Sequence, residues 1–418
     1  MHGFINACNI LHTGHVHSEM NMEIVMCIAL LCACVDARHH STRARAGLPR
    51  VGHNIAGLEM DRPLIIGHRG SAGMMPEHSL EGYKLAIKQG TDVIECDMCL
   101  TKDLKIVCLH ESWFSRVTNV KDDPEFRDKI VSREVEGSLI NDWFSVDFTL
   151  KELKKLRLIQ PNSFRDQTHN LKYPMATLTE LIDLVKAEDR TVAIHAETKN
   201  PEWVNSLDLV KNANTTFEDI VVEVLEARGY DSEYSPFFLQ SFSEESLRAL
   251  AQRTTVPKVM LVWKEGVTQE KLMELSEFCY GMGLWKDLII TGWNDAYGYK
   301  NYAWNRTDLV ERIHNLGMKV HIYTMRNEDR YLLWDYGQDP RREYEAFLQL
   351  GVDGYFTDFP ATLKSLLDDA YISSAIPCAT LCPPSLSSPG SSSDKNKKQS
   401  KSILRSIRAL LCSVYCDE

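Results

Sequence analysis

The feature that most limits how this chain can fold is a regular alternation of short apolar segments with amphipathic ones between residues 64 and 357. This pattern is typical of parallel β/α units rather than of a β-sandwich. The expected strands are Leu64–His68, Asp92–Met98, Thr191–Thr198, Phe237–Phe242, Pro257–Val262, Leu288–Thr291, Lys319–Tyr323 and Asp353–Thr357. Eight such units predict an α/β fold, a TIM (β/α)8 barrel, over residues 62–365.

The segments between these strands carry helical patterns. The expected helices include Leu178–Lys186, Thr216–Arg228, Glu244–Gln252, Gln269–Phe278, Asp308–Leu316 and Glu343–Leu350. Several segments end in glycine, as helix C-termini prefer; examples are Gly90, Gly317 and Gly351.

One connection is too long for a single crossover helix. About 80 residues separate His110 from the strand at Thr191. Residues 106–110 are expected to pair with the second strand as a hairpin, and residues 111–174 to form a small insertion. We expect this insertion to lie over the C-terminal face of the barrel, where substrate-binding loops belong.

Composition narrows the possible partners. The chain is 44% apolar and 25% charged, which is typical of a soluble globular protein, and its net charge is −11. A general nucleic-acid or anionic-membrane binder would need a basic face, so neither is expected. An anionic substrate would depend on a local cluster of cations or on a bound metal.

The two ends of the chain differ from the middle. Residues 1–37 are expected to be a signal peptide, because the apolar run 22–37 is too short to span a bilayer and ends in small residues. An internal core helix is the alternative. Residues 383–402, rich in Ser, Pro and Lys, predict a disordered linker. Residues 403–418 form a short basic amphipathic tail, either a marginal helix or a weak membrane contact.

Two features accompany the predicted export to the secretory lumen or the exterior. Asn214 and Asn305 stand in glycosylation sequons. Of the 12 cysteines, eight remain after the leader. If the hairpin turns at residues 103–104, Cys99 and Cys108 lie opposite each other, as a disulfide or as two buried free thiols.

The strand pattern predicts that three carboxylate side chains lie close together. Glu95 and Asp97 are two residues apart on one expected strand, so their side chains point to the same face. Burying both without compensation is costly, so they require either a basic partner or a hard cation such as Ca²⁺ or Mg²⁺. Glu197 ends the next parallel strand and completes a three-carboxylate site, with Lys199 beside it for a phosphate oxygen. His195, one layer deeper, is expected to be an interior histidine.

Two histidines end apolar strands in the same region. His68 and His110 are expected at the barrel mouth, where they would form the acid–base pair that phosphodiester cleavage requires. Arg69 has the forked donors that suit a phosphate. Glu77 is expected either to cap the following helix or to orient a catalytic histidine.

Taken together, these motifs resemble one family. HRG (68–70), PEHS (76–79), ECD (95–97), AETK (196–199), LQSF (239–242) and GYFTDFP (354–360), together with His110, look like the glycerophosphodiester phosphodiesterases, in the longer periplasmic or secreted branch. The resemblance implies a TIM barrel and a Ca²⁺ or Mg²⁺ ion on Glu95, Asp97 and Glu197. It also implies acid–base roles for His68 and His110.

The resemblance further implies the reaction. Glycerophosphodiesters such as glycerophosphocholine would be hydrolysed to sn-glycerol 3-phosphate and an alcohol. The chain departs from the family pattern at Glu111, where Asp is usual, and at Tyr323, where Trp is frequent. These differences leave the orienting role of position 111 and the head-group preference open.

Three alternatives remain at this point. A sphingomyelinase D-like phospholipase would have the same site but a compact barrel, which the long insertion disfavours. An inactive secreted binding barrel would be expected to have lost a histidine or a metal carboxylate, and none is lost. A membrane-tethered enzyme would result if the leader were retained.

Overall fold

The computed structural model describes residues 55, 57–58, 61–294 and 300–375. The predicted leader (1–37), linker (383–402) and tail (403–418) lie outside the described residues. Within the described ranges, no helix combines the length and apolar character that a membrane span requires.

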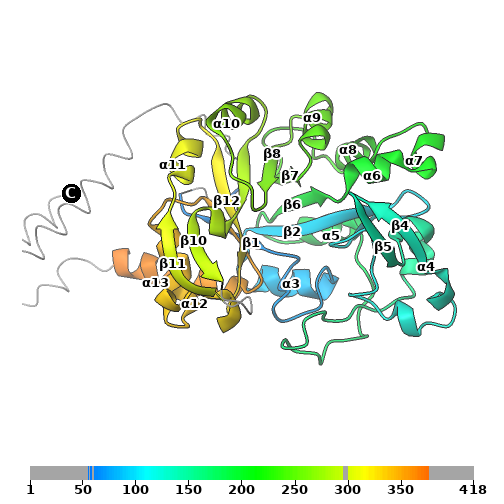
Figure 1. Ribbon diagram of the computed structural model, residues 1–418, viewed down its shortest axis with the longest axis horizontal. Helices are drawn as coiled ribbons and strands as arrows, with labels where there is room; N and C mark the ends of the chain where they lie inside the picture. Colours follow the sequence, from blue (N-terminus) through cyan, green and yellow to red (C-terminus); the bar gives the residue numbers. More distant parts are fainter. Residues whose placement is uncertain (1–54, 56, 59–60, 295–299, 376–418) are drawn as a thin grey trace, which may run out of the picture. The chain divides into compact units, whose positions relative to one another are not determined.

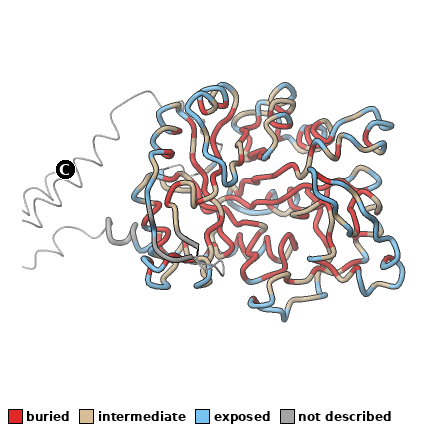
Figure 2. Tube along the Cα trace, in the orientation of Figure 1, coloured by how far each residue is buried: buried red, intermediate tan, exposed pale blue. Residues whose placement is uncertain are grey.

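Eight parallel strands close into a barrel (Figure 1). They are β1 (Leu64–Gly67), β2 (Val93–Leu100), β6 (Ala193–Thr198), β7 (Phe237–Ser241), β8 (Lys258–Val262), β9 (Gly281–Trp285), β12 (Lys319–Met325) and β13 (Gly354–Thr357). Each strand pairs with the next in this order, and β13 pairs with β1 to close the ring. The predicted TIM-barrel fold is confirmed. Figure 2 shows the strands buried along most of their length.

Helices connect the strands. They are α3 (Leu80–Lys88), α5 (Leu178–Lys186), α6 (Pro201–Ser206), α7 (Asp208–Asn212), α8 (Phe217–Ala227), α9 (Glu244–Arg253), α10 (Gln269–Ser276), α11 (Leu309–His314), α12 (Pro340–Leu348) and α13 (Pro360–Ala375). Hydroxyl side chains of Ser79, Thr177, Thr216, Ser243 and Thr268 accept backbone N–H bonds at five helix starts. These N-caps satisfy donors that the first helical turn would otherwise leave unpaired.

The expectation of a barrel strand at Leu288–Thr291 is wrong. The sixth barrel strand is β9, which ends before this segment begins. The predicted segment instead contains the end of the 3-10 helix η4 (Lys286–Leu288) and the start of β10 (Ile290–Asn294). β10 pairs with β11 (Lys300–Arg306) in a separate two-stranded sheet.

The sequence of β9 explains this error. Its GMGLW pattern lacks the β-branched residues that mark strands, and such residues are present in the apolar run after it. The glycines are there because neighbouring strands approach closely. A Cβ at Gly281 would lie 2.6 Å from the Lys319 carbonyl oxygen, and one at Gly283 would lie 2.4 Å from Leu261 Cδ2. Packing therefore dictates residues that local propensity disfavours.

The insertion between β2 and β6 has its own small elements. β3 (Ile106–Cys108) pairs antiparallel with β2, as expected. After it come η1 (Val120–Asp122), η2 (Arg127–Lys129), the hairpin β4 (Val131–Val135) and β5 (Ser138–Asp142), η3 (Ser145–Asp147) and α4 (Leu150–Leu153). Phe114, Phe126 and Phe148 pack edge to face, with ring centroids 5.2 and 5.4 Å apart, in a core that also contains Leu153.

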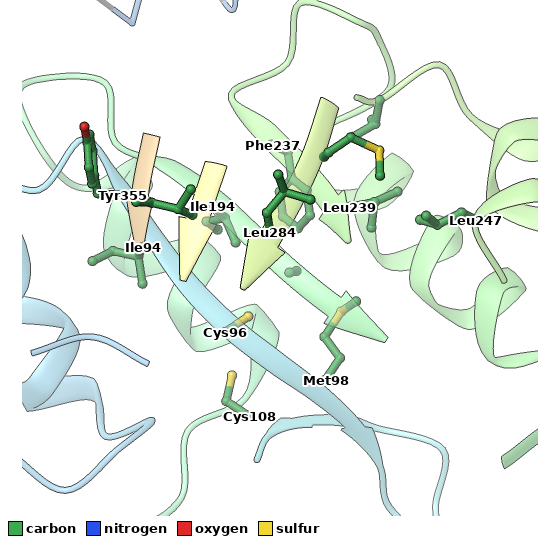
Figure 3. Close-up of a cluster of buried hydrophobic side chains, with 14 of the residues drawn as sticks. Ile94, Cys96, Met98, Cys108, Ile194, Phe237, Leu239, Leu247, Leu284 and Tyr355 are labelled. Carbon is green, nitrogen blue, oxygen red and sulfur yellow. The ribbon is translucent and has the colours of Figure 1, made fainter. Parts of the chain in front are cut away.

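The cysteines near the β2–β3 hairpin are free thiols. The register pairs Met98 with Cys108 and Cys99 with Val107, so Cys99 and Cys108 point to opposite faces. A Cys99–Cys108 disulfide is therefore excluded by geometry, and both thiols are buried and unpaired. Cys96 shares the face of Cys108, and the two lie close together in the core (Figure 3).

The insertion core should be sensitive to cavity formation. Leu153→Ala removes a fully buried side chain, and we expect it to lower the free energy of unfolding by about 2–5 kcal/mol. Leu139→Ala, in the same insertion but on a side chain that is 77% exposed, is the matched control and should change it by less than about 0.5 kcal/mol. Equal effects in urea unfolding would contradict a packed insertion core.

Candidate active site

Strands β2 and β6 place three carboxylates inside the barrel mouth. Their register sets Glu95 beside His195 and Asp97 beside Glu197. All three carboxylates are buried, and one oxygen from each lies within 4.8 Å of the others. The structure thus brings together the three residues that the sequence predicted as metal ligands. His195 lies one layer deeper, with Nε2 3.3 Å from His321 Nδ1.

Each of these carboxylates has one oxygen held by a protein donor. The Arg69 backbone N–H donates to Glu95 Oε2 (2.6 Å), and Lys199 Nζ donates to Glu197 Oε1 (2.7 Å). The third carboxylate, Asp97, is held by His78, whose Nε2 lies 2.9 Å from Asp97 Oδ2. The remaining oxygens suit a hard divalent cation, which prefers oxygen ligands.

Gln240 adds to this donor set. It follows Leu239 in β7, and its Nε2 lies 3.4 Å from Glu95 Oε1. Its Oε1 is buried without a hydrogen-bond partner. A buried amide oxygen without a donor, beside three carboxylates, fits a site that accommodates a cation. The LQSF motif is visible in the sequence, but its pattern alone gives Gln240 no role.

The protonation of the carboxylates reflects their crowding. Burial raises the pKa of Glu95 well above its usual value and that of Glu197 to about 8, and the Asp97 charge adds to both shifts. Burial also tends to raise the pKa of Asp97, but the Lys199 ammonium and the hydrogen bond from His78 lower this pKa well below its usual value. Without a metal, the cluster therefore does not hold three full negative charges near neutral pH.

Both strand-end histidines contact a carboxylate through Nδ1. His68 Nδ1 lies 2.6 Å from Asp358 Oδ1, and His110 Nδ1 lies 2.9 Å from Glu111 Oε1. The longer Glu111 side chain thus still reaches its histidine. Burial, followed by the Arg69 charge, lowers the pKa of each histidine to about 4. Both imidazoles are therefore neutral near pH 7, and a proton on Nδ1 leaves Nε2 as the basic nitrogen.

Asp358 is a site residue that the sequence analysis did not identify. Its Oδ2 accepts hydrogen bonds from Arg165 Nη2 (2.6 Å) and Arg326 Nε (2.9 Å). Arg165 comes from the insertion, and its Nε also donates to Glu328. Asp358 follows β13, so only the closure of the barrel brings it beside His68. The TDFP motif that contains Asp358 is visible in the sequence, but His68, the histidine that Asp358 contacts, lies 290 residues earlier.

Glu77 differs from both of its expected roles. Ser79 caps α3. Glu77 instead accepts hydrogen bonds from Arg69 Nη1 (3.1 Å) and Arg116 Nη2 (2.8 Å). It therefore orients the arginine expected to bind phosphate, whereas Asp358 and Glu111 contact the histidines.

The barrel mouth is divided into a charged half and an aromatic half. One cavity of about 700 Å³ is lined by the three carboxylates and Lys199 on one side, and by aromatic rings on the other. Four of the rings, Phe242, Trp263, Trp285 and Tyr323, lie in or directly after four consecutive barrel strands, and Tyr331 and Phe356 also line this cavity. Trp263 stacks on Trp285 (5.0 Å between centroids) and on Tyr323 (6.1 Å).

A second, smaller cavity adjoins the first. It measures about 220 Å³ and is lined by four arginines, Arg69, Arg116, Arg165 and Arg326. Two of these come from the insertion. His68 and His110 line both cavities, so these two histidines lie where the cavities meet.

The metal-free protein should lose stability as the pH rises from about 5 to 8. Glu197 has a pKa of about 8 when folded, and about 4.3 is usual for an unfolded chain. Between these two pH values Glu197 is protonated in the folded protein and ionised in the unfolded chain. The free energy of unfolding therefore falls as the pH rises. Glu197→Gln should reduce this fall by at least about 1.4 kcal/mol, the value of one pH unit.

Urea unfolding in chelator at pH 5 and pH 8 measures this difference. Glu226→Gln, at an exposed position of α8, serves as the control and should behave as the unaltered protein does. Parallel pH dependence in the Glu197→Gln variant and the unaltered protein would show that the carboxylate does not titrate in this range.

Sequence comparisons agree with this geometry. The sequence model of the glycerophosphoryl diester phosphodiesterase family matches residues 68–362. The glycerophosphodiester phosphodiesterase GDPD6 of Arabidopsis thaliana is 38% identical over 330 residues, which cover 74% of this chain and 87% of that protein. The glycerophosphodiester phosphodiesterase of Haemophilus influenzae is 27% identical over 370 residues, covering 76% and 93%.

Solved structures share the fold. A glycerophosphoryl diester phosphodiesterase structure from Silicibacter pomeroyi superposes with a TM-score of 0.55 at 19% identity, covering 76% of this chain and 98% of that one. A phosphodiesterase from Oleispira antarctica, solved with the product sn-glycerol-3-phosphate, gives a TM-score of 0.50 at 21% identity, covering 73% and 97%. The extent of the family match and the identity to GDPD6 show that the chain belongs to the glycerophosphoryl diester phosphodiesterase family.

Proposed function

We propose that this glycerophosphodiester phosphodiesterase acts on small substrates such as glycerophosphocholine, with a divalent cation, Ca²⁺ or Mg²⁺. The observation that carries the proposal is the pair of carboxylate-bound histidines beside three buried carboxylates at one barrel mouth. The products would be sn-glycerol 3-phosphate and the free alcohol. The product complex of the Oleispira enzyme supports this assignment by analogy.

Arg69 and Lys199 bind the phosphate in this proposal. Arg69 Nε is buried without a hydrogen bond, 3.7 Å from Asp97 Oδ2, so it keeps a donor for a phosphate oxygen. A cation held by Glu95, Asp97 and Glu197 would supply further positive charge for the phosphate oxygens. Because the charged side chains here are largely buried, they act with little screening on the charge that develops at the phosphate.

His68 and His110 transfer the protons in this proposal. Neutral His68 or His110 accepts a proton at Nε2 from the nucleophile, which is either water or the neighbouring glycerol hydroxyl. The other histidine takes up a proton from water when the anionic phosphate binds beside it, and gives that proton to the leaving alcohol oxygen as the P–O bond breaks. A glycerol nucleophile would give a cyclic phosphate that water then opens. Asp358 and Glu111 accept the Nδ1–H bonds and stabilise each imidazolium as it forms.

The head group is proposed from the aromatic half of the mouth. Quaternary ammonium groups bind over Trp and Tyr rings within about 6 Å. Trp263, Trp285 and Tyr323 line the larger cavity, so ring surface that they present to it suits choline, and Tyr323 keeps an aromatic ring where Trp is frequent in the family. Lysophospholipids, the substrates of a sphingomyelinase D-like enzyme, are the competing class.

Metal removal tests the proposal. Excess chelator should abolish hydrolysis of glycerophosphocholine, and added Ca²⁺ or Mg²⁺ should restore it. Phosphorus NMR of the products distinguishes sn-glycerol 3-phosphate from a cyclic phosphate, and a parallel series of lysophospholipids distinguishes the two substrate classes. Full activity in excess chelator would remove the metal from the proposal.

The acid–base roles make a second prediction. His68→Ala and His110→Ala should each lower kcat at least ~100-fold, the scale of general acid–base catalysis. Asp358→Asn should also lower kcat, because the amide does not offer His68 the same charged acceptor. Asp368→Asn, at an exposed carboxylate paired with Lys364, is the control. A mutant that keeps a tenth of the activity would show that its residue is not essential.

The proposal also includes export of the protein, with cleavage of its leader and glycosylation. Cleavage near Ala37 would release the enzyme into the secretory lumen or the medium, with sugar on Asn214 and Asn305; Asn214 is exposed at the turn before α8. The net charge of −11 supports the absence of a nucleic-acid partner, and the amphipathic tail (403–418) is the segment proposed for weak membrane contact.

N-terminal sequencing tests the predicted cleavage. Protein recovered from the medium should begin near Arg38, and glycosidase treatment should lower its apparent mass. Recovery with residues 1–37 intact would contradict cleavage and favour a tethered enzyme.

A further inference from the structure

One buried histidine near the proposed metal site has no part in the mechanism above. His78 lies between Glu77 and the start of α3, with only 1% of its surface exposed. Its Nε2 lies 2.9 Å from Asp97 Oδ2, and its Nδ1 lies 2.8 Å from the Tyr83 hydroxyl. Both ring nitrogens are thus engaged. The sequence analysis noted PEHS but considered only Glu77.

We propose that His78 and Tyr83 form a hydrogen-bond relay that holds Asp97 in the orientation needed to bind the metal. They are positioning residues, since both act through the carboxylate. The inference rests on the proposed metal dependence and extends it to residues of α3 that do not bind the ion.

The chemistry of the groups sets the direction of the relay. An ionised Asp97 only accepts hydrogen bonds, so His78 carries its proton on Nε2 and donates it. In this tautomer Nδ1 accepts the Tyr83 O–H. The Tyr83 hydroxyl lies beside the Cys108 thiol, next to Cys96 in the core, where both sulfurs are visible (Figure 3). Each donor in the series therefore points toward Asp97.

The backbone fixes the ring from the other side. His78 has a left-handed φ of +58°, which is uncommon for a residue other than glycine, and its N–H donates to the Arg69 carbonyl (3.1 Å). This bond ties the relay to the HRG segment. Tyr83 is fully buried on the inner face of α3. Both side chains are thus held in a close-packed environment.

Asp97 needs such a restraint more than the other two carboxylates. Glu95 is held by a backbone N–H, and Glu197 by Lys199. Asp97 lies near two cations, with Arg69 Nε 3.7 Å from Oδ2 and Lys199 Nζ 3.9 Å from Oδ1. A freely rotating carboxylate would turn toward one of them. The relay occupies Oδ2 with an N–H donor and leaves Oδ1 for a cation.

Metal affinity, rather than activity, tests the relay. Full-length protein is stripped of metal, and the Kd values for Ca²⁺ and Mg²⁺ are measured by calorimetry. We expect His78→Leu to weaken binding by about 10–100-fold, as loss of such outer contacts usually does. Tyr83→Phe removes only the outer hydroxyl and should cause a smaller loss. His78→Gln, which keeps an N–H at similar reach, should recover part of the affinity.

A second histidine–tyrosine pair provides the control. His169 Nδ1 lies 3.3 Å from the Tyr173 hydroxyl in the insertion, and His169 Nε2 lies 4.0 Å from Asp166, none of them near the metal carboxylates. His169→Leu and Tyr173→Phe should leave both Kd values unchanged. Circular dichroism of the metal-free proteins confirms that each variant is folded.

The outcomes separate this inference from the proposed function. If the unaltered protein binds no divalent cation, the metal dependence fails, and the relay fails with it. If it binds and a folded His78→Leu binds equally well, only the relay is overturned. If His78→Leu does not fold, the nearly isosteric Tyr83→Phe decides: weaker binding than in Tyr173→Phe supports the relay, and equal binding overturns it.

Discussion

The active site depends on three carboxylates that are buried within 4.8 Å of one another at the mouth of a barrel. In a low-dielectric environment such a cluster is stable only if protons, cations or a metal compensate its charge. The protein supplies Arg69 and Lys199, and the carboxylate pKa values show that these do not compensate it fully. The remaining deficit of positive charge is what makes this mouth suited to a divalent cation and a phosphate together.

His68 and His110, the two histidines at the barrel mouth, each contact a carboxylate, but the two carboxylates come from different parts of the chain. Glu111, directly after His110, is a local partner, whereas Asp358 reaches His68 only because β13 closes against β1. Arg165 then connects Asp358 to the insertion. The insertion therefore contributes to the chemistry through a buried ion pair, in addition to lining the smaller cavity.

Much of the fold could be predicted from the sequence, because alternating apolar and amphipathic segments impose parallel β/α units. Seven of the eight barrel strands were expected at nearly the right places, and β9 was not, because its glycines serve the approach of β8 and β12. That error also hid Trp285, which ends β9 and forms part of the aromatic half of the mouth.

The candidate site was predictable where a residue's role follows from its own strand. Glu95, Asp97 and Glu197 point inward by alternation, and the structure brings them together. Asp358, Gln240 and His78 were missed because their importance comes from partners on other elements. Glu77 has an orienting role, but its partners are arginines rather than a histidine, and one of them, Arg116, lies 39 residues further along. Side-chain pairing across the barrel mouth is not encoded in local pattern.

Barrel closure also has a consequence for biosynthesis. A chain that emerges from the ribosome exposes β1 first and β13 last of the barrel strands, and domains generally fold as units once complete. His68 is therefore synthesised long before Asp358, the carboxylate that orients it. A nascent or truncated chain would carry the carboxylates of β2 and β6 without an oriented His68. Hydrolytic competence would then arise only when the last barrel strand has been added.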